Sequence, residues 1–390
     1  MRSCLRRGAL AVLVCAALAG CGNRETQQAL KSARTLADQK QYEDANDVLV
    51  EALRMRENEV RAQLPAPTDQ SGIDDLTKKV QSDPEILKME RAQVPLYLHM
   101  QRPDLASAVY SDILSGDPGD TAVFDTLQDP DPAIRLGAVR VLDLAGHPAV
   151  IPPLIGATKD ENQDVRRAAV GALGTVKDPQ VVPPLIDALK DSYWFVRSDA
   201  ANALGRENDA RAVDPLFGAM NDSDKTVQGS AQTALITLAT SKKVSADAYA
   251  AHLNDANTEV KTVAAVALAV KQDARATPVL LKLAASTDVA TRLNAVKGLG
   301  ETGDPAVAPT LRGLLHDPDV NVKGWSIIGL AKVKDQAALP DLKAIGADAN
   351  EPQSIRDAAN AAVGRITGTD AMSGPGGADD TGAGASGAAP

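Results

Sequence analysis

The apolar positions of this chain recur with a period of about 31 residues between residues 129 and 367. One position in each period is basic, or Gln in one case, and successive members are spaced by 31, 31, 31, 33, 31, 31 and 33 residues. The members of this series are Arg135, Arg166, Arg197, Gln228, Lys261, Arg292, Lys323 and Arg356. Ala or Ser follows three residues later, and Leu or Val seven residues later, which is helical spacing. A repeat of this length buries its apolar face only by stacking on copies of itself.

Each repeat is predicted to form two short helices. In residues 160–190, the apolar positions Val165, Ala169 and Leu173 follow Asn162, which is a favourable N-cap residue. A second apolar run follows, and its two prolines suit the first turn of a helix. We expect an Asp or Asn at each helix start to accept hydrogen bonds from free backbone N–H groups. The first-helix caps are Asp131, Asn162, Asp224, Asn257, Asp288 and Asp319, and the second-helix caps are Asp178, Asp209, Asp273, Asp304 and Asp335.

The pattern Asp-x-x-x-x-Val-Arg-x-x-Ala-x-x-x-Leu-Gly, followed by Asp-Pro-x-x-Val-x-Pro-Leu-Ile, resembles the HEAT-like repeats named after phycobilisome lyases. Residues 160–191 fit it nearly throughout, and the resemblance covers about residues 121–367. It implies an all-α fold, a right-handed α-solenoid of about eight helix pairs, with each Val-Arg helix lining the concave face. It also implies that the basic series and the acids that open the repeats form a structural ladder between neighbours. These acids are Asp129, Asp160, Asp191, Asp222, Asp255 and Asp317.

Three departures from the pattern matter. Gln228 replaces the basic residue, Thr291 replaces the usual Val, and the helix that contains Tyr249 lacks the Pro-Leu-Ile run. We therefore expect a bend or looser packing near residues 223–255.

The repeats are flanked by two regions of different character. Residues 21–118 are predicted to form helical hairpins that partly resemble tetratricopeptide repeats, and the alternative is an irregular helical cap over the open end of the solenoid. The positions that carry this resemblance are Tyr42, Ala45, Leu49, Ala52, Ala106, Tyr110, Ile113 and Pro118. Residues 368–390 are Gly, Ala, Ser, Asp and Pro with almost no large apolar residue, which predicts a disordered tail. The predicted domains are thus 1–20, 21–118, 119–367 and 368–390.

The first 21 residues predict an export signal. Arg2, Arg6 and Arg7 precede an apolar run that is too short to span a bilayer and ends in Leu-Ala-Gly before Cys21. This resembles the bacterial lipoprotein signal, which implies that Cys21 is lipidated and becomes the first residue of the mature chain; the alternative is an ordinary cleaved signal peptide. Gly22 is not Asp, so the enterobacterial sorting rule favours the outer membrane.

Composition narrows the possible partners. Only 3% of residues are aromatic, so we expect a core of Ala, Val, Leu and Ile, and no sustained alternation predicts strands. The net charge is −10, and loss of the three arginines of the signal takes it to −13. This argues against nucleic acid or an anionic lipid surface as the main partner, and it is compatible with a basic protein partner.

No combination of residues in the sequence matches a known catalytic motif. Cys4 and Cys15 would leave with the signal and Cys21 would carry lipid, so no thiol is expected to remain for a metal, a disulfide or catalysis. The histidines share no helix face; they are His99, His147, His252 and His316. Residues 298–303 match the dinucleotide fingerprint in letters, but they end a repeat helix and follow no strand. We expect no enzyme activity, no metal and no cofactor besides the lipid.

Two aromatic features stand out as candidate partner-binding sites. Three of the ten aromatic residues are consecutive at Tyr193, Trp194 and Phe195, and Trp325 stands at a phase that the resemblance places in the concave groove. The alternative is that both tryptophans pack within the repeats, Trp194 over the inter-repeat turn. By the same phase argument, the other groove residues are Asp199, Asn202, Arg206, Lys297 and Ile328.

These features predict a non-catalytic, membrane-anchored scaffold in the bacterial cell envelope that binds a protein or peptide in its concave groove. One alternative is a subunit of an envelope assembly or transport complex. A remote alternative, suggested by the family name, is a bilin lyase or isomerase, which would carry a bound chromophore.

Overall fold

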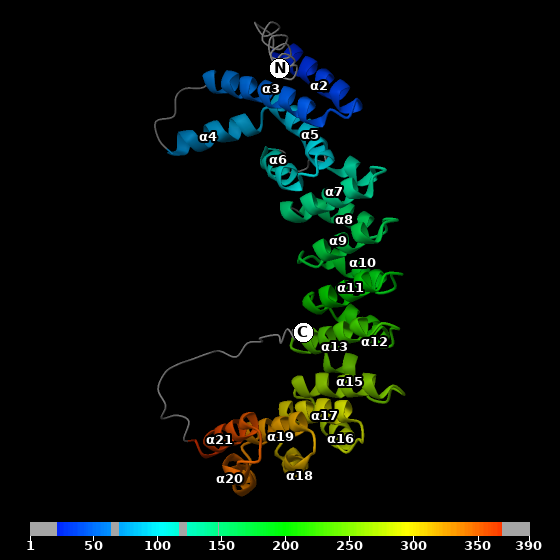
Figure 1. Ribbon diagram of the computed structural model, residues 1–390, viewed down its shortest axis with the longest axis vertical. Helices are drawn as coiled ribbons and strands as arrows, with labels where there is room; N and C mark the ends of the chain where they lie inside the picture. Colours follow the sequence, from blue (N-terminus) through cyan, green and yellow to red (C-terminus); the bar gives the residue numbers. More distant parts are fainter. Residues whose placement is uncertain (1–21, 64–69, 117–122, 147, 369–390) are drawn as a thin grey trace. The chain divides into compact units, whose positions relative to one another are not determined.

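The structure, a computed structural model, describes residues 22–63, 70–116, 123–146 and 148–368, and every regular element in these ranges is a helix (Figure 1). The chain divides into two compact units, Met1–Ala234 and Leu235–Pro390. The predicted signal, Cys21 and the predicted tail from 369 onward lie outside the described residues. Among the described helices, none is both long enough and apolar enough to cross a membrane.

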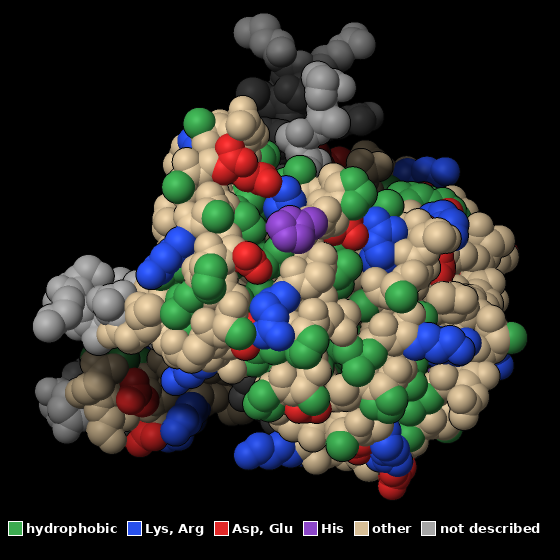
Figure 2. Space-filling model, turned by 90° about the horizontal axis from the view of Figure 1, so that it is seen from below, with side chains coloured by type: hydrophobic (Ala, Val, Ile, Leu, Met, Phe, Trp, Pro, Cys, Tyr) green, Lys and Arg blue, Asp and Glu red, His purple; other side chains and the backbone are tan. Residues whose placement is uncertain are grey.

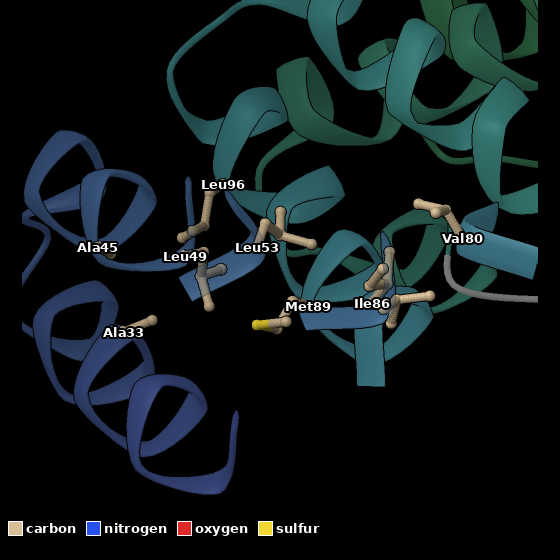
Figure 3. Packing of buried hydrophobic residues seen from close by; sticks show 9 residues of the cluster. Ala33, Ala45, Leu49, Leu53, Val80, Ile86, Met89 and Leu96 are labelled. Carbon is tan, nitrogen blue, oxygen red and sulfur yellow. The ribbon is translucent and has the colours of Figure 1, made fainter. Parts of the chain in front are cut away.

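Two helical hairpins and an intervening helix open the first unit. The helices are α2 (Gly22–Asp38), α3 (Tyr42–Ala62), α4 (Gln70–Gln81), α5 (Pro84–His99) and α6 (Pro103–Gly116). α2 packs against α3, and α5 packs against both α3 and α6. Their shared core includes Ala33, Leu49 and Met89 from three different helices (Figure 3). The predicted hairpins are thus present, whereas their membership of the tetratricopeptide family remains a prediction.

The first unit continues with repeats, in which first helices alternate with short second segments. These are the 3-10 helix η1 (Phe124–Gln128), α7 (Pro132–Ala145), η2 (Pro148–Val150), α8 (Ile151–Ala157), α9 (Gln163–Leu173), η3 (Pro179–Val181), α10 (Val182–Ala188), α11 (Trp194–Arg206), η4 (Ala210–Ala212), α12 (Val213–Ala219) and α13 (Lys225–Ala239). α6 packs directly on α7, so the N-terminal helices and the first repeats belong to one compact unit.

The second unit repeats the same alternation. Its elements after α13 are α14 (Ala246–Ala250), α15 (Thr258–Val270), α16 (Ala276–Leu283), α17 (Val289–Glu301), η5 (Pro305–Val307), α18 (Ala308–Gly313), η6 (Leu314–His316), α19 (Val320–Lys332), η7 (Gln336–Ala338), α20 (Leu339–Ala347) and α21 (Gln353–Thr367). In the described part of the chain, eight first helices run from α7 to α21, and the last of them has no second helix after it. The solenoid thus has about eight repeat units, as predicted, and the last unit consists of its first helix alone.

The boundary between the units lies in the region where the repeat pattern departs most. It falls inside α13, which carries Gln228, and α14, which carries Tyr249, is only five residues long. The Tyr249 side chain is fully buried, and its hydroxyl donates a hydrogen bond of 3.3 Å to the carbonyl oxygen of Leu235. The division thus falls within the predicted range 223–255, while the bend predicted there stays a prediction.

Small residues allow neighbouring first helices to approach closely. A Cβ added to Gly205 of α11 would lie 2.8 Å from Cα of Ala234 in α13, and one added to Gly300 of α17 would lie 3.2 Å from Cα of Gly329 in α19. Because these contacts are to backbone atoms, a larger residue would force the helices apart. This explains the small residues at these positions of α11, α13, α17 and α19.

The predicted helix caps are confirmed with two exceptions, Asp273 and Asp335. Asp273 accepts a hydrogen bond from the amide of Arg275, but Arg275 is itself the N-cap residue of α16, so Asp273 caps a turn and not the helix. Asn162 accepts hydrogen bonds from the amides of Asp164 and Val165, and Asp178 accepts one from Gln180. The second segments begin as 3-10 turns at these caps, rather than directly as α-helices. The prediction for Asp335 is wrong, because its carboxylate accepts a hydrogen bond of 2.6 Å from Arg312 and makes no cap bond.

Candidate functional site

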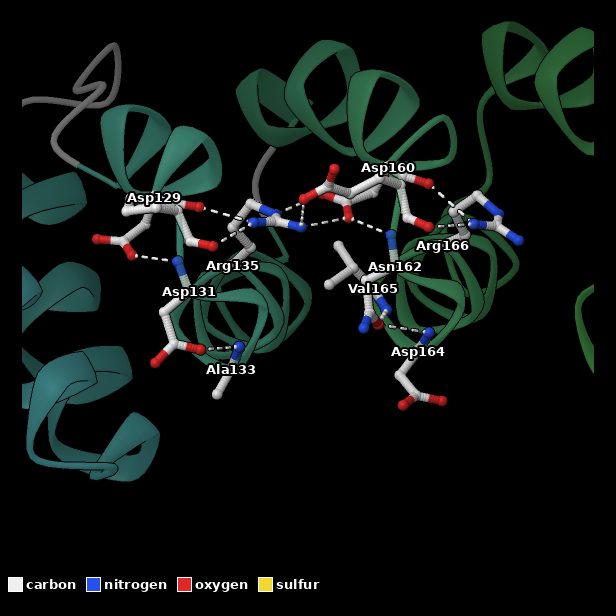
Figure 4. Close-up of polar contacts among 11 residues, drawn as sticks. Asp129, Asp131, Ala133, Arg135, Asp160, Asn162, Asp164, Val165 and Arg166 are labelled. Carbon is white, nitrogen blue, oxygen red and sulfur yellow. Dashed lines mark hydrogen bonds and ion pairs between the residues drawn. The ribbon is translucent and has the colours of Figure 1, made fainter.

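The basic series and the repeat-opening acids form an ion-pair ladder, as the family resemblance implied. Arg135 donates from Nε to Asp160 Oδ2 at 2.7 Å and from Nη2 to Asp160 Oδ1 at 2.8 Å (Figure 4). Its Nη1 also donates to the carbonyl oxygen of Asp129, which opens its own repeat. Three further bidentate pairs repeat this geometry: Arg166 with Asp191, Arg197 with Asp222, and Arg292 with Asp317.

Each acid of the ladder also organises its own turn. Asp191 accepts the backbone N–H of Tyr193 at 2.8 Å while it binds Arg166. Burial alone would raise the pKa of Asp191, but the hydrogen bonds from Arg166 and from the Tyr193 amide outweigh it, so the pKa lies below its ordinary value. The pKa values of Asp160, Asp222 and Asp317 are lowered in the same way. The carboxylates of the ladder are thus already bound by side chains and amides of the repeats. We therefore assign the ladder a structural role.

Three steps of the ladder are modified. At one of them, Ser286 stands 25 residues after Lys261 in place of an acid. Gln228 keeps the bond to the turn, because its Nε2 donates to the carbonyl oxygen of Asp222 at 2.6 Å, but it carries no charge. Near the C-terminal end, Lys323 pairs through a single contact with Glu351. The arginine geometry is bidentate and more directional than either substitute.

In the first unit, the consecutive aromatic residues form one cluster at the start of α11. Tyr193 precedes the helix, and Trp194 and Phe195 are its first two residues. The Trp194 and Phe195 rings stack with centroids 3.5 Å apart and planes at 27°, and the Tyr193 ring lies 5.4 Å from Phe195. All three side chains are half-buried, so the cluster lies outside the core and still presents aromatic surface. Part of the Trp194 side chain is buried by the Phe195 ring that stacks on it, so its partial burial does not require a place in the core.

A basic side chain from the preceding repeat completes this cluster. Arg167 of α9 lies with Cζ 4.4 Å from the Phe195 ring centroid, and its Nε donates to Asp199 at 2.7 Å. Arg167 was not among the predicted site residues. Its signal in the sequence is its place directly after the ladder residue Arg166, because this position lies on the flank of the first helix that faces the next repeat.

The other two predicted residues of α11 are solvent-exposed. Asn202 lies one turn after Asp199, and Arg206, at the end of the helix, donates weakly to the carbonyl oxygen of Gly174 at 3.4 Å. Phe195, Asp199, Asn202 and Arg206 follow each other at helical spacing. They therefore form one continuous face of α11, here called the α11 face.

In the second unit, the predicted residues lie together on α17 and α19. Lys297 of α17 lies with Nζ 5.2 Å from the centroid of the Trp325 ring, and Ile328 follows Trp325 on the same face of α19. All three side chains are half-buried. Near the ends of the same helices, Lys332 binds Glu301 at 2.6 Å. Lys297, Trp325 and Ile328 are here called the α19 face.

The two faces belong to different compact units, so the groove predicted to join them stays a prediction. Figure 2, seen from below, shows hydrophobic, basic and acidic side chains interspersed rather than gathered by kind. A partner would recognise such a surface through particular side chains, because no large patch of a single charge is present on this face to attract it.

The sequence analysis missed a hollow of about 590 Å³ beside the first rung of the ladder. Its lining includes Phe124 and Leu127 of η1, Pro153 and Ala157 of α8, and Arg135 of α7. The hollow lies next to η1, which is only five residues long. In a later repeat, the corresponding second segment consists of the three residues of η3 and the seven of α10. The cue in the sequence is the absence of a complete repeat before Asp129.

Histidine chemistry follows the packing. His99 contacts the Pro95 carbonyl oxygen through Nδ1 at 2.8 Å and lies 3.5 Å from Asp129 through Nε2. Its ring lies beside the Tyr42 ring, with centroids 4.8 Å apart and planes tilted by 31°. His147 lies outside the described residues. Over the ranges that the structure describes, no group of three His, Cys, Asp or Glu side chains has the geometry to hold a metal ion.

Comparison with known families identifies the repeats. The model of HEAT repeats matches residues 121–205, 155–236, 182–269, 246–322 and 277–364, which together cover more than half of the chain. The chain therefore belongs to the HEAT-repeat family, and its fold is an all-helical solenoid of HEAT repeats. No protein with a curated description matches it.

Several solved structures are similar in fold. Kap95p in a complex with RanGDP matches 94% of this chain and 62% of its own, at 13% identity and a TM-score of 0.52. Kap95 in a complex with Nup1 matches 93% of this chain and 61% of its own, at 14% identity and a TM-score of 0.50. The CpcE–CpcF complex of phycocyanin lyase from Nostoc sp. PCC7120 has 22% identity over 63% of this chain and 93% of its own, with a TM-score of 0.31. The two Kap95 likenesses show the fold alone.

Proposed function

We propose that this protein is a non-catalytic scaffold of the bacterial cell envelope, held by lipid on Cys21 at the periplasmic face of the outer membrane. In this account it binds a protein or peptide through the α11 face and the α19 face. The observation that carries the proposal is the presence of half-buried aromatic side chains on the first helices, outside the repeat cores. Aromatic residues that remain accessible are enriched among binding anchors.

The fold supports protein binding as the activity. The solved complexes of Kap95p hold RanGDP and Nup1, and both are proteins bound to a HEAT-repeat chain. Stacked repeats present long surfaces of adjacent side chains, and such surfaces suit extended partners. The ladder stabilises this surface without using the residues of either face.

The partner experiment is crosslinked affinity purification from membranes, with an affinity tag placed after Gly368. The parent is compared with the Phe195→Ala/Trp325→Ala double variant at matched expression and matched unfolding midpoint. We expect at least one membrane or periplasmic protein to be enriched with the parent and reduced at least fivefold with the variant. Equal recovery of all partners by both proteins would exclude the two faces as the binding surface.

The anchoring experiment is metabolic labelling with a palmitate analogue. Cys21→Ser should abolish labelling and release the protein from the membrane fraction, because the lipid provides the membrane affinity. Cys15→Ser is the matched control and should still be labelled. Membrane retention of the Cys21→Ser protein at the parental level would refute lipid anchoring at this residue.

A further inference from the structure

The α19 face carries a basic side chain, Lys297, for which no carboxylate partner is found in the part of the chain that the structure describes. α17 and α19 contain four basic residues, and both helices are fully described. Three of them are paired with carboxylates: Arg292 with Asp317, Lys323 with Glu351, and Lys332 with Glu301. Among the described residues, the recorded contact of Lys297 is the Trp325 ring. The corresponding cation beside the aromatic cluster of the first unit, Arg167, is already paired with Asp199.

The contact recorded for Lys297 does not use the hydrogen-bond donors of its ammonium group. An ammonium group has three donors, and the ring of Trp325 covers one side of it. Lys297 is half-buried, and a carboxylate that reached its ammonium group would form a charge-assisted hydrogen bond. Glu301 lies one turn further along α17, but its carboxylate binds Lys332 at 2.6 Å.

The surroundings of this charge are apolar. Trp325 and Ile328 present half-buried surface from α19. On the other side, Val266 of α15 lies against α17, since its Cγ2 would be 3.0 Å from a Cβ added to Gly298. A ligand for this site therefore needs a carboxylate with a large apolar group next to it.

We propose that the α19 face binds a segment of a partner protein that presents one Asp or Glu side chain to Lys297 and a neighbouring large apolar side chain to Trp325 and Ile328. This inference rests on the proposed scaffold function and specifies the partner's chemistry. The segment carries a single acid instead of an acidic run, because the whole chain has a net charge of −10 and one unpaired cation offers only local attraction.

The test is selection of random 12-residue peptides displayed on phage against the purified full-length protein. Enriched peptides are expected to contain one Asp or Glu within four residues of Leu, Ile, Met, Phe or Trp. Their binding should fall about tenfold with Lys297→Gln, as expected for loss of a charge-assisted contact. A parallel selection on Lys297→Glu should enrich Lys or Arg in place of the acid. Lys343→Glu, an exposed charge reversal on α20, is the matched control and should leave the selection unchanged.

The outcomes separate this inference from the scaffold function. Peptides without an acid, peptides whose binding is insensitive to Lys297→Gln, or no enrichment at all would overturn the proposed recognition. If the enriched peptides required Phe195 but neither Lys297 nor Trp325, the protein would still bind partners, and only the site assigned on α19 would be wrong. Urea unfolding midpoints measured for each variant show whether a loss of binding reflects a loss of folded protein.

Discussion

Arg166 and its counterparts join neighbouring repeats through two kinds of contact at once. The Arg166 guanidinium binds the Asp191 carboxylate of the next repeat and the carbonyl oxygen of Asp160 in its own. The side chains of the pair are only 13% and 10% exposed. Removing one partner would leave a carboxylate in a poorly hydrated place, which costs more than the pair itself contributes.

We therefore predict that Arg166→Ala lowers the free energy of unfolding by about 3 kcal/mol. Arg140→Ala is the matched control, because Arg140 is exposed on α7, and it should change the value by less than about 0.5 kcal/mol. Urea denaturation followed by circular dichroism measures both. A similar, small loss for the two variants would mean that the ladder contributes little.

Glu90 of α5 presents the opposite electrostatic case. Its Oε2 is buried without a hydrogen-bond partner among the described residues, and Asp112 and Glu57 lie near enough to repel its charge. Burial first, and these two carboxylates second, raise the pKa of Glu90 to about 7. Folding thus favours the protonated acid, so its contribution to stability is complete below the ordinary pKa of 4.5 and is lost as the pH rises through about 7.

Glu90→Gln, which is neutral at every pH, should therefore stabilise the protein by about 1–2 kcal/mol near pH 8. The gain is modest because Glu90 is only half-buried and solvent screens part of the repulsion. The gain should disappear near pH 5, where the native acid is protonated. Glu51→Gln, an exposed position on α3, should give no such pH-dependent difference. Urea midpoints at the two pH values test this, and a gain of equal size at both would contradict the assigned pKa.

At the scale of the element, the spacing between first helices depends on small residues. Gly205→Ala would bring a Cβ to 2.8 Å from Cα of Ala234, so α11 and α13 would have to separate. We predict a loss of about 1–3 kcal/mol in the free energy of unfolding. Gly229→Ala in α13 meets nothing within 4 Å and should instead stabilise the helix by up to about 1 kcal/mol. Thermal unfolding of the two variants checks the opposite signs.

The sequence predicted the elements well because their determinants are local. The 31-residue period, the Asp and Asn caps and the Val-Arg phase fix where the first helices begin, and α9 and α19 start directly after their predicted caps Asn162 and Asp319. Two features were not predictable in this way. The second segments start as 3-10 turns, and Asp335 binds Arg312 instead of capping its helix. The Asp335 contact depends on Arg312, a residue outside the segment concerned.

The candidate site was predicted only in part for a similar reason. Helical phase correctly placed Phe195, Asp199 and Asn202 on one face of α11, because phase is a property of a single helix. The contacts of Arg167 with Phe195 and of Lys297 with Trp325 join two repeats. They depend on the offset between neighbouring helices, which a repeat period does not specify.

At the scale of the whole molecule, the four ladder aspartates make the free energy of unfolding depend on pH in the acidic range. The pKa values of Asp160, Asp191, Asp222 and Asp317 are lowered in the folded state. Their contribution to stability is therefore present above the ordinary pKa of 3.8, and it is lost as the pH falls through the lower folded values.

We predict a steep fall in the urea midpoint below about pH 4. Asp191→Asn, which removes one titrating group, should start from a lower stability and lose less of it over the same range. If the parent and the variant had the same pH dependence, the Asp191 pair would not contribute to acid sensitivity.

In the proposed scaffold, the first-helix faces, and not the second segments, bind the partner. Site-specific photocrosslinking in intact cells tests it most directly, with a photoreactive amino acid placed at exposed positions. Asn202 of α11 and Asn321 of α19 lie on first helices, whereas Gln180 of η3 and Lys343 of α20 lie on second segments. We predict that Asn202 or Asn321 yields a discrete crosslinked partner and that neither second-segment position does. A partner crosslinked only through Gln180 or Lys343 would contradict the claim.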